Sequence, residues 1–354
     1  MEKSNIHPNF QLNGIAISEN TIVELSYSLI KEGEDFEKEI GDFLLQWVDV
    51  NDTIIVETSG STGEPKSIKL QKKHMVNSAL ATGDFFNLKP KYSALLCMST
   101  NFIAGKMMLV RAMVLGLHLT AVPAKLDPLD GLVQTFDFCA MVPMQLQNSL
   151  DKIERIETVI IGGAPMSKNL KDKLQGIKTQ VFETYGMTET ITHIALKKIN
   201  SSSANVFTTL AGVVVSKDER DCMVINAPRI SDAPIITNDI IELLSKTEFT
   251  WLGRYDSIIN SGGIKLIPEQ IEEKLAKVIE DRFFVTGIPD DILGQKLVLI
   301  IESKTENPDI LAHVQSIKGL DKYERPKEVL FLKAFIETTS GKINRKKTIH
   351  LLSC

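Results

Sequence analysis

A run of glycine, serine and threonine that ends in a lysine is the segment of this sequence most suited to chemistry. It follows the β-branched residues 53–57, which we expect to form a strand. Its glycines permit backbone conformations that other residues resist, and successive N–H groups can surround phosphate oxygens. Lys66 would add a positive charge, although Glu64 and Pro65 rule out Walker A spacing. A flexible surface loop is the alternative for this composition. The candidate phosphate loop consists of Thr58, Ser59, Gly60, Ser61, Thr62, Gly63 and Lys66.

The same run, residues 58–66, resembles the phosphate loop of the adenylate-forming superfamily, which includes acyl-CoA synthetases, peptide-synthetase adenylation domains and luciferases. Five further segments resemble the motifs of that superfamily and occur in the same order, as far as Arg345. One such segment alone is weak evidence, because short glycine-containing turns are common. Six in order over most of the chain favour the superfamily strongly.

The resemblance implies a site for the adenine ring and the phosphates of ATP. The family motif Y-G-x-T-E corresponds to a segment that begins with Tyr185 and Gly186. By that match Tyr185 lines the adenine, Thr188 donates a hydrogen bond to the α-phosphate, and Glu189 holds Mg²⁺, which prefers oxygen ligands. The adenine loop of the family corresponds to Gly162, Gly163 and Ala164.

The resemblance also implies a ribose site. Thr237-Asn238-Asp239 matches the family's T-G-D, with asparagine in place of the usual glycine. Asp239 would accept hydrogen bonds from both ribose hydroxyls, and Arg254 would reach the same sugar. Asparagine also tolerates a left-handed backbone, so the departure leaves the role of Asp239 in place.

The last matches imply a hinge, a CoA channel and a catalytic lysine. Asp256 corresponds to the hinge about which a small C-terminal domain rotates, and Gly263 and Lys265 correspond to the channel for the pantetheine arm. Lys342, in the final G-K-x-x-R motif, would bridge the substrate carboxylate and the α-phosphate. The implied activity is that of an AMP-forming acid–thiol ligase. Its substrates are a carboxylic acid, ATP and CoA, and it uses Mg²⁺.

Two departures from the family pattern bear on the acid. The phosphate loop begins at residue 58, so we expect a reduced N-terminal subdomain, and a partner chain could supply one wall of the acid pocket. Phe102 stands where relatives often carry histidine, and two cations, Lys106 and Arg111, follow on an apolar helix. They either snorkel to solvent or face a second carboxylate on the substrate. Short members with a dicarboxylate substrate occur among o-succinylbenzoate–CoA ligases of menaquinone synthesis, which the chain resembles.

Three alternatives to an o-succinylbenzoate–CoA ligase remain open at this point. One is a ligase for another aryl or short-chain acid, and another is an adenylation enzyme that loads a carrier-protein thiol. The third is a non-catalytic sensor of nucleotide or acyl-adenylate. The intact residues Lys66, Glu189, Asp239 and Lys342 disfavour the sensor.

The elements that must position these residues follow an alternating pattern. Between residues 73 and 183, helix-like and strand-like segments alternate, which predicts an α/β fold with parallel sheet built from βαβ units. Ligands bind at the carboxyl ends of such strands. The helical spacing of apolar residues between positions 28 and 48 predicts one amphipathic helix. We expect an N-terminal domain at residues 1–254 and a small α+β domain at residues 255–354.

Composition restricts the partners. The net charge is −5 without a long run of one sign, which disfavours a nucleic-acid surface. No apolar stretch is long enough to span a membrane, and we expect no secretory signal because residues 1–10 are polar. The four cysteines have no metal-ligand spacing, and Cys97 and Cys139 lie in apolar runs. We therefore expect a cytoplasmic enzyme with core thiols; a homo-oligomer stays open.

Overall fold

The structure is a computed structural model that describes residues 6–57, 67–200, 205–305, 307, 309–337 and 343–352. The described residues divide into two compact units. The large unit contains those up to residue 214 together with residues 226–235, and the small unit contains residues 215–225 and 236–352. The small unit thus includes residues 236–254 as well as those after 254. A domain boundary between residues 254 and 255 stays a prediction.

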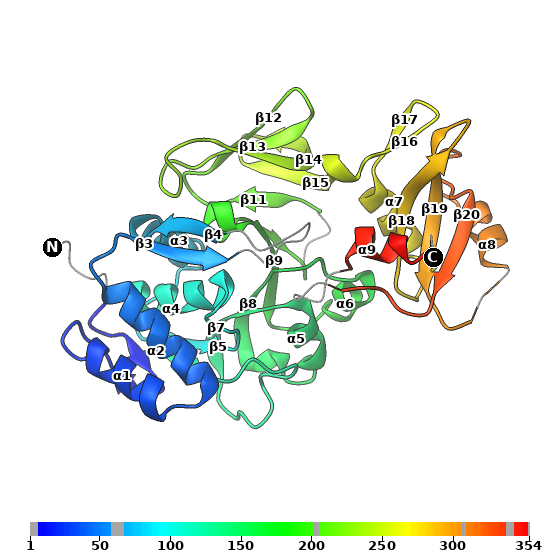
Figure 1. Cartoon of the computed structure of the whole chain (residues 1–354). Helices are drawn as coiled ribbons and strands as arrows, with labels where there is room; N and C mark the ends of the chain where they lie inside the picture. Colours follow the sequence, from blue (N-terminus) through cyan, green and yellow to red (C-terminus); the bar gives the residue numbers. More distant parts are fainter. Residues whose placement is uncertain are drawn as a thin grey trace. The chain divides into compact units, whose positions relative to one another are not determined.

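A sheet with a parallel centre forms the middle of the large unit (Figure 1). Its strands follow the order β11-β10-β9-β8-β7-β5-β6-β1-β2. Each neighbouring pair from β9 to β1 is parallel, which confirms the predicted βαβ construction. The strands are β1 (Gln11–Leu12), β2 (Ile15–Ala16), β5 (Ser93–Leu96), β6 (His118–Ala121), β7 (Phe136–Met141), β8 (Ile156–Ile161), β9 (Gln180–Gly186), β10 (His193–Lys198) and β11 (Phe207–Thr209).

Helices cover both faces of this sheet. They are α1 (Ile22–Glu32), α2 (Asp35–Val48), α3 (Lys72–Phe86), α4 (Ile103–Leu115), α5 (Pro143–Asn148) and α6 (Lys168–Lys173), with the short 3₁₀ turns η1 (Ile153–Arg155) and η2 (Thr188–Thr190). Two adjacent residues of β7 show which helices lie on each face of the sheet, because successive side chains of a strand point in opposite directions. Cys139 packs with the residues of α5 and α6, whereas the ring of Phe138 lies 5.5 Å from that of Phe86 in α3. The fold is therefore layered α/β, as predicted.

The prediction of one helix over residues 28–48 is wrong, because two helices meet near Gly33. Glu34 is extended and forms a capping box with Glu37, which starts α2 anew. A side chain at Gly33 would lie 2.5 Å from the Leu29 carbonyl oxygen. The periodicity of apolar residues continued across the break and so concealed it.

The strand predicted at residues 53–57 is present as β3 (Thr53–Glu57), but it lies outside the central sheet. It forms an antiparallel pair with β4 (Ser67–Gln71), and Glu57 is opposite Ser67. Those two residues are the described neighbours of the candidate phosphate loop. The loop itself, residues 58–66, lies outside the described residues.

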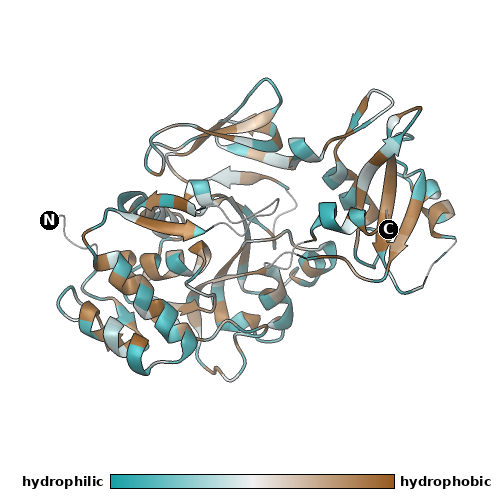
Figure 2. Cartoon of the chain, viewed as in Figure 1, coloured by the Kyte–Doolittle hydropathy of each residue, from teal (hydrophilic) through white to brown (hydrophobic). Residues whose placement is uncertain are grey.

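The first strands of the small unit follow the order β12-β13-β14-β15, and β14 and β15 pair in antiparallel fashion. A second sheet has the order β17-β16-β19-β18, and β20 pairs with β19. Figure 2 shows β18, β19 and β20 as strongly hydrophobic. The elements are β12 (Val214–Lys217), β13 (Cys222–Asn226), β14 (Ile235–Ser245), β15 (Glu248–Arg254), η3 (Tyr255–Ser257), β16 (Ile259–Ser261), β17 (Ile264–Leu266), α7 (Pro268–Leu275), β18 (Phe283–Asp290), β19 (Gly294–Glu302), α8 (Ile310–Ser316), β20 (Glu328–Leu332) and α9 (Arg345–His350).

Two apolar clusters cover opposite faces of this second sheet. Ile271 of α7 and Val314 of α8 pack on one face with Val285 and Leu299. Phe284 and neighbouring strand residues face the other side, where partly buried side chains of α9 contact them. The β18–β19 ladder extends as far as Pro289 and Asp290.

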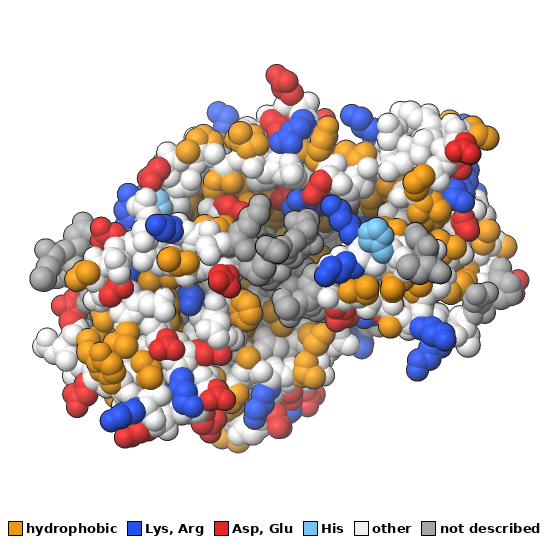
Figure 3. Space-filling model, in the orientation of Figure 1, with side chains coloured by type: hydrophobic (Ala, Val, Ile, Leu, Met, Phe, Trp, Pro, Cys, Tyr) orange, Lys and Arg blue, Asp and Glu red, His pale blue; other side chains and the backbone are white. Residues whose placement is uncertain are grey.

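The cysteines and the surface agree with the composition. Cys97 and Cys139 are fully buried, as predicted for core thiols. In the part of the chain that the structure describes, no helix is both long and apolar enough to cross a bilayer. Figure 3 shows acidic and basic side chains interspersed over the face in view.

We predict that Gly41→Ala destabilises the large unit. Alanine normally favours a helix interior over glycine by about 1 kcal/mol. Here the new Cβ would lie 2.7 Å from the Ser26 carbonyl oxygen and 2.8 Å from Ile30 Cγ1, so α1 and α2 must separate. We expect a net loss of about 1–3 kcal/mol in the free energy of unfolding. Chemical denaturation measures it. The exposed control Gln46→Ala, in the same helix, should change stability by less than about 0.5 kcal/mol; equal effects would contradict the packing argument.

Candidate active site

The ends of β8 and β9 place two of the predicted motifs side by side in the large unit. The strands are parallel, so the residues that follow both lie at one edge of the sheet. Thr184 Oγ1 donates a hydrogen bond of 3.0 Å to the Ile161 carbonyl oxygen, next to Gly162. A Cβ at Gly162 would lie 2.6 Å from that hydroxyl, and Gly163 has a φ of +83°. The turn after β8 therefore requires glycine at positions 162 and 163, and Ala164 is the next residue.

The residues after Tyr185 form a tight turn that exposes a carboxylate. A Cβ at Gly186 would lie 2.2 Å from the Thr192 carbonyl oxygen, so this position also requires glycine. Thr188 and Glu189 follow in η2, where Thr188 is half-buried and Glu189 is exposed. Among the described residues no cluster of three metal-ligating side chains exists. One exposed carboxylate still fits Mg²⁺, which usually takes one or two carboxylates and otherwise water and substrate phosphates.

A buried ion-pair cluster behind this turn was not predicted from the sequence. Glu183 of β9 is 8% exposed, and its Oε2 lies 2.7 Å from Lys197 Nζ and 3.2 Å from Lys171 Nζ. Burial opposes ionisation, but the two lysines lower the pKa of Glu183 below its ordinary value of 4.5. Lys197 Nζ also lies 4.5 Å from the ring centre of Phe207, which contacts Tyr185 edge-on at 6.0 Å. Lys197 thus connects the ion-pair cluster to Phe207, whose ring packs against that of Tyr185.

The small unit brings Asp239 and Arg254 together. They face each other across the β14–β15 ladder, and Arg254 Nη1 lies 3.9 Å from Asp239 Oδ1. Trp251 Nε1 donates to the same Oδ1 over 3.2 Å, which the sequence did not indicate. Asp239 is 6% exposed, so these donors fix the orientation of its carboxylate. Asn238 lies in β14 without a positive φ, so no glycine is needed at that position.

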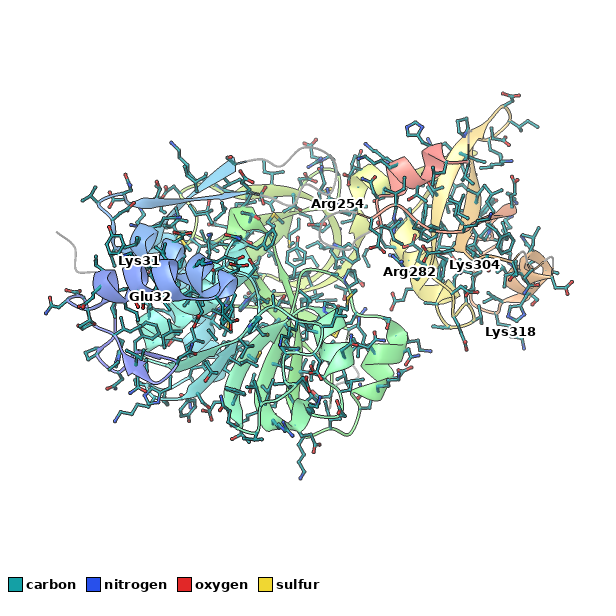
Figure 4. All side chains as sticks on the ribbon, turned by 60° about the horizontal axis from the view of Figure 1, so that its bottom comes forward. Lys31, Glu32, Arg254, Arg282, Lys304 and Lys318 are labelled. Carbon is teal, nitrogen blue, oxygen red and sulfur yellow. The ribbon has the colours of Figure 1, made fainter. Side chains whose placement is uncertain are left out.

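The predicted hinge and channel residues lie further along the small unit. Arg254, labelled in Figure 4, donates two hydrogen bonds to the exposed carboxylate of Asp256, of 2.9 and 3.0 Å. Those bonds lower the pKa of Asp256. Gly263 has a φ of +81° in the turn between β16 and β17, and Lys265 is exposed on β17.

The structure separates the two cations of α4. Lys106 is 7% exposed, and its Nζ donates to the Thr100 carbonyl oxygen over 2.7 Å. Burial lowers the pKa of Lys106, while Glu39 and Asp42 oppose that shift. Phe102, which precedes α4, is 54% exposed. Lys106 therefore belongs to a local network with carboxylates of this chain.

Arg111 has a different environment. Its side chain is 1% exposed, and no described carboxylate lies within ion-pair distance. Its nitrogens reach Thr82 Oγ1, Thr192 Oγ1 and His193 Nδ1, all over a long 3.4 Å. Burial lowers the pKa of Arg111 to about 9, so it stays charged at neutral pH. Burial and Arg111 together hold the pKa of His193 well below its ordinary value.

A cavity of about 520 Å³ lies elsewhere in the large unit, beside the first turn of α2 and the ends of β5 and β6. Its wall includes Glu34, Asp35 and Glu39 but none of the predicted site residues. Three carboxylates repel anions, so this cavity does not suit a nucleotide or a carboxylate substrate. The turns after β8 and β9 remain the better candidate site. The predicted residues Thr58, Ser59, Gly60, Ser61, Thr62, Gly63, Lys66 and Lys342 lie outside the described residues.

Comparison with known proteins agrees with these motifs. A family profile described as AMP-binding enzyme matches residues 16–221, more than half of the chain. The chain belongs to the AMP-binding enzyme family. It is therefore an AMP-forming acid–thiol ligase, as predicted, and the substrates of this family are a carboxylic acid, ATP and CoA.

Individual members of the AMP-binding enzyme family are similar over most of the chain. A crystal structure from Dyadobacter fermentans, named as an acyl-CoA synthetase (AMP-forming)/AMP-acid ligase II-like protein, is 36% identical. The match covers 93% of this chain and 98% of that one, with a TM-score of 0.62. A 2-succinylbenzoate–CoA ligase of Bacillus cereus is 27% identical over 338 residues, which is 84% of this chain and 70% of the relative. The O-succinylbenzoate coenzyme A synthetase of Bacillus subtilis, solved with ATP and magnesium, shares the fold at 18% identity, with a TM-score of 0.71 and coverage of 93% and 82%.

We predict that Lys197→Met destabilises this family member by about 3 kcal/mol at pH 7, because it removes one of two cations from a buried carboxylate. Thermal and urea unfolding measure the change. The neighbour Lys198, only partly buried, supplies the control Lys198→Met.

The pH dependence tests the same cluster. A carboxylate whose pKa is lower in the folded chain contributes stability above its unfolded pKa and loses it as the pH falls through the folded pKa. Glu183→Gln should therefore be less stable than wild type above about pH 4.5, and the difference should shrink in more acidic solution. A difference that stays constant between pH 3 and 7 would contradict the ion-pair role.

Proposed function

We propose that the chain is an o-succinylbenzoate–CoA ligase of menaquinone biosynthesis. The observation that carries the proposal is Arg111, a buried cation without a described carboxylate partner. It touches Thr192 and His193, which lie three and four residues after Glu189 in the chain. The name of the curated Bacillus relatives supports the same substrate.

Arg111 suits a carboxylate for energetic reasons. A buried charge without a partner costs several kcal/mol, and contacts of 3.4 Å to neutral atoms offset little of that. A carboxylate from a ligand would replace the long contacts with charge-assisted, bidentate hydrogen bonds. Neutral His193 would accept a hydrogen bond from Arg111 through Nδ1 and, without a positive charge of its own, would not compete with Arg111 for the carboxylate. A substrate with two carboxylates could thus place one beside Arg111 and offer the other for reaction.

The proposed reaction has two steps. In the first, a carboxylate oxygen attacks the α-phosphorus of ATP, the bond to the β-phosphate oxygen breaks, and pyrophosphate leaves. Lys342 neutralises the approaching anions, Thr188 donates to the α-phosphate, and Asp239 with Arg254 holds the ribose. Mg²⁺ beside Glu189 would neutralise phosphate charge when bound. In the second step the CoA thiol loses its proton, its sulfur attacks the acyl carbon, and AMP leaves.

A rotation about Asp256 would separate the two steps. We propose that it withdraws Lys342 and brings the Gly263 and Lys265 side of the small unit to the acyl-adenylate. Closure of this kind also protects the reactive anhydride from water.

The direct test is acid-dependent formation of AMP from ATP with Mg²⁺ and CoA. The panel contains o-succinylbenzoate, benzoate, 4-coumarate, acetate and a medium-chain fatty acid. We expect rapid AMP formation with o-succinylbenzoate only. Preference for a monocarboxylate would replace the proposed substrate with another aryl or short-chain acid. Measurable ATP binding without turnover would instead favour a carrier-protein acceptor or a sensor.

We further predict opposite effects of Arg111→Met on activity and stability. The variant should lose about 10- to 100-fold in kcat/KM for o-succinylbenzoate, because a charged hydrogen bond contributes about 1.5–3 kcal/mol. The KM for ATP should stay the same. The melting temperature should stay equal or rise, because an apolar side chain removes an unpaired buried charge. A cation with a purely structural role would instead produce a less stable protein.

Lys106→Met is the matched comparison for Arg111→Met, since both side chains are buried cations of α4. We expect it to reduce stability, because Glu39 and Asp42 lose their neighbouring charge. The selectivity for o-succinylbenzoate should be unchanged. An acid-specific loss in Lys106→Met alone would assign the second carboxylate to Lys106 and contradict the role of Arg111.

A further inference from the structure

A tight turn of the small unit presents an arginine whose side chain is fixed in place. The turn joins β12 to β13 and contains Asp218 and Arg220. Asp218 Oδ1 accepts from the backbone N–H groups of Arg220 and Cys222 over 2.8 and 3.0 Å, which closes the turn. Asp218 Oδ2 accepts from Nε and Nη2 of Arg220 over 2.9 and 2.7 Å. One carboxylate therefore orients both the backbone of the turn and the guanidinium.

Two further hydrogen bonds of Arg220 reach the strand that carries Asp239. Nη1 donates to Asn238 Oδ1 over 3.0 Å, and Nη2 donates to the Thr237 carbonyl oxygen over 3.1 Å. Thr237 Oγ1 in turn donates to the Met223 carbonyl oxygen over 2.8 Å and accepts from the Asp239 N–H over 3.0 Å. The two residues that precede Asp239 are thus held from the β12–β13 turn.

Arg220 also contacts the residue that follows Arg254. Its guanidinium lies over the Tyr255 ring, 5.3 Å from the ring centre. Arg254, labelled in Figure 4, is opposite Asp239 in the β14–β15 ladder. One guanidinium therefore contacts the residue before Asp239 and the residue after Arg254, so it holds the neighbours of both members of this pair.

The asparagine at position 238 makes the first of these contacts possible. The motif that this segment resembles has glycine there, and glycine has no side chain to accept a hydrogen bond. Asn238 is exposed and lies in β14 without a positive φ, so neither burial nor backbone conformation accounts for it. The departure from glycine thus gives Arg220 an acceptor directly beside Asp239.

These contacts suit a role in binding better than a role in stability. The Arg220 side chain is 37% exposed, and an exposed ion pair alone stabilises a protein little. Hydrogen bonds of fixed geometry instead reduce the freedom that the binding residues must lose when they engage a ligand. A carboxylate and a guanidinium that must meet two adjacent hydroxyl groups depend on that geometry.

We propose that Arg220 is a positioning residue for the ribose hydroxyls of ATP. It acts through Asn238 and Tyr255, the neighbours of the ribose pair, and touches no substrate itself. The inference rests on the proposed role of Asp239 and Arg254 in holding the ribose. Loss of Arg220 should therefore weaken recognition of the two hydroxyls and leave the rest of the nucleotide bound as before.

The test compares ATP with a dideoxy analogue that lacks both ribose hydroxyls, by calorimetric titration of the full chain with Mg²⁺ present. Wild type should bind ATP on the order of 10- to 100-fold more tightly, because hydrogen bonds to charged groups contribute that much. Arg220→Met should weaken ATP binding about 5- to 20-fold and binding of the analogue by less than about twofold. Equal weakening of both nucleotides would indicate general damage and overturn the proposal, as would unchanged binding of ATP.

Arg220→Lys separates geometry from charge. Lysine keeps the positive charge, but a single ammonium cannot replace the planar fork that contacts Asp218, Asn238 and Thr237 together. The lysine variant should therefore lose nearly as much discrimination between the two nucleotides as Arg220→Met. Discrimination equal to wild type in Arg220→Lys would show that charge alone attracts the nucleotide, and it would contradict the positioning role.

Lys217→Met is the matched control. Lys217 is the last residue of β12, beside the same turn, and its Nζ lies 2.5 Å from Asp221 Oδ1. The variant removes an ion pair of this turn but retains Arg220. The Kd of both nucleotides should stay within about twofold of wild type. A loss of discrimination as large as that of Arg220→Met would assign the effect to the turn in general and overturn the assignment to Arg220.

The same titrations distinguish failure of this inference from failure of the proposed function. Equal affinity of wild type for both nucleotides, with no effect of Asp239→Ala on either, would contradict the proposed ribose role of Asp239. Strong discrimination by wild type that is lost in Asp239→Ala but fully retained in Arg220→Met would leave that role intact and contradict the positioning role of Arg220 alone.

Discussion

The parallel pairing of β5, β7, β8 and β9 is the constraint on which the large unit depends. Parallel strands end at the same edge of their sheet, so every turn that follows them must gather there. The Gly162 turn and the Tyr185 turn consequently become neighbours, although more than twenty residues separate them in the chain. Their contact is close enough that a side chain at Gly162 would collide with the Thr184 hydroxyl. The same pairing leaves the apolar residues of each strand facing two layers of helices, which hold the edge rigid.

Buried charges divide into two kinds in this protein. Glu183 and Lys106 have opposite charges nearby, and these neighbours offset much of the cost of burial. Arg111 has neutral partners at long distances and therefore remains costly. A protein that keeps such a charge sacrifices stability at that position, as binding sites often do. The contrast between Lys106 and Arg111 is instructive because both are buried cations of one apolar helix, five residues apart, and the fold places described carboxylates near the first but not near the second.

The small unit combines a sheet that has apolar clusters on both faces with the residues proposed for two different reaction steps. Asp239 and Arg254 lie together on adjacent strands, whereas Gly263 and Lys265 lie on a separate hairpin. Ion pairs join Glu337 to Arg282, just before β18, and Arg345 to Glu272 of α7. For the proposed rotation about Asp256, a body that moves without changing its internal geometry is an advantage. The interior of the second sheet, with apolar clusters on both faces, meets that requirement.

The sequence alone determined the family, the parallel α/β sheet and most helices and strands, because the motifs are local and strongly patterned. It also singled out Tyr185, Glu189, Asp239 and Arg254 through their motifs, but it did not show that Asp239 lies within the long strand β14. It did not reveal the break between α1 and α2, since one amphipathic period continues across Gly33. Nor could it distinguish Lys106 from Arg111 or find the partners of Glu183 and Arg345. Those are contacts between residues distant in the chain, and only the packing of strands and helices decides which charges meet.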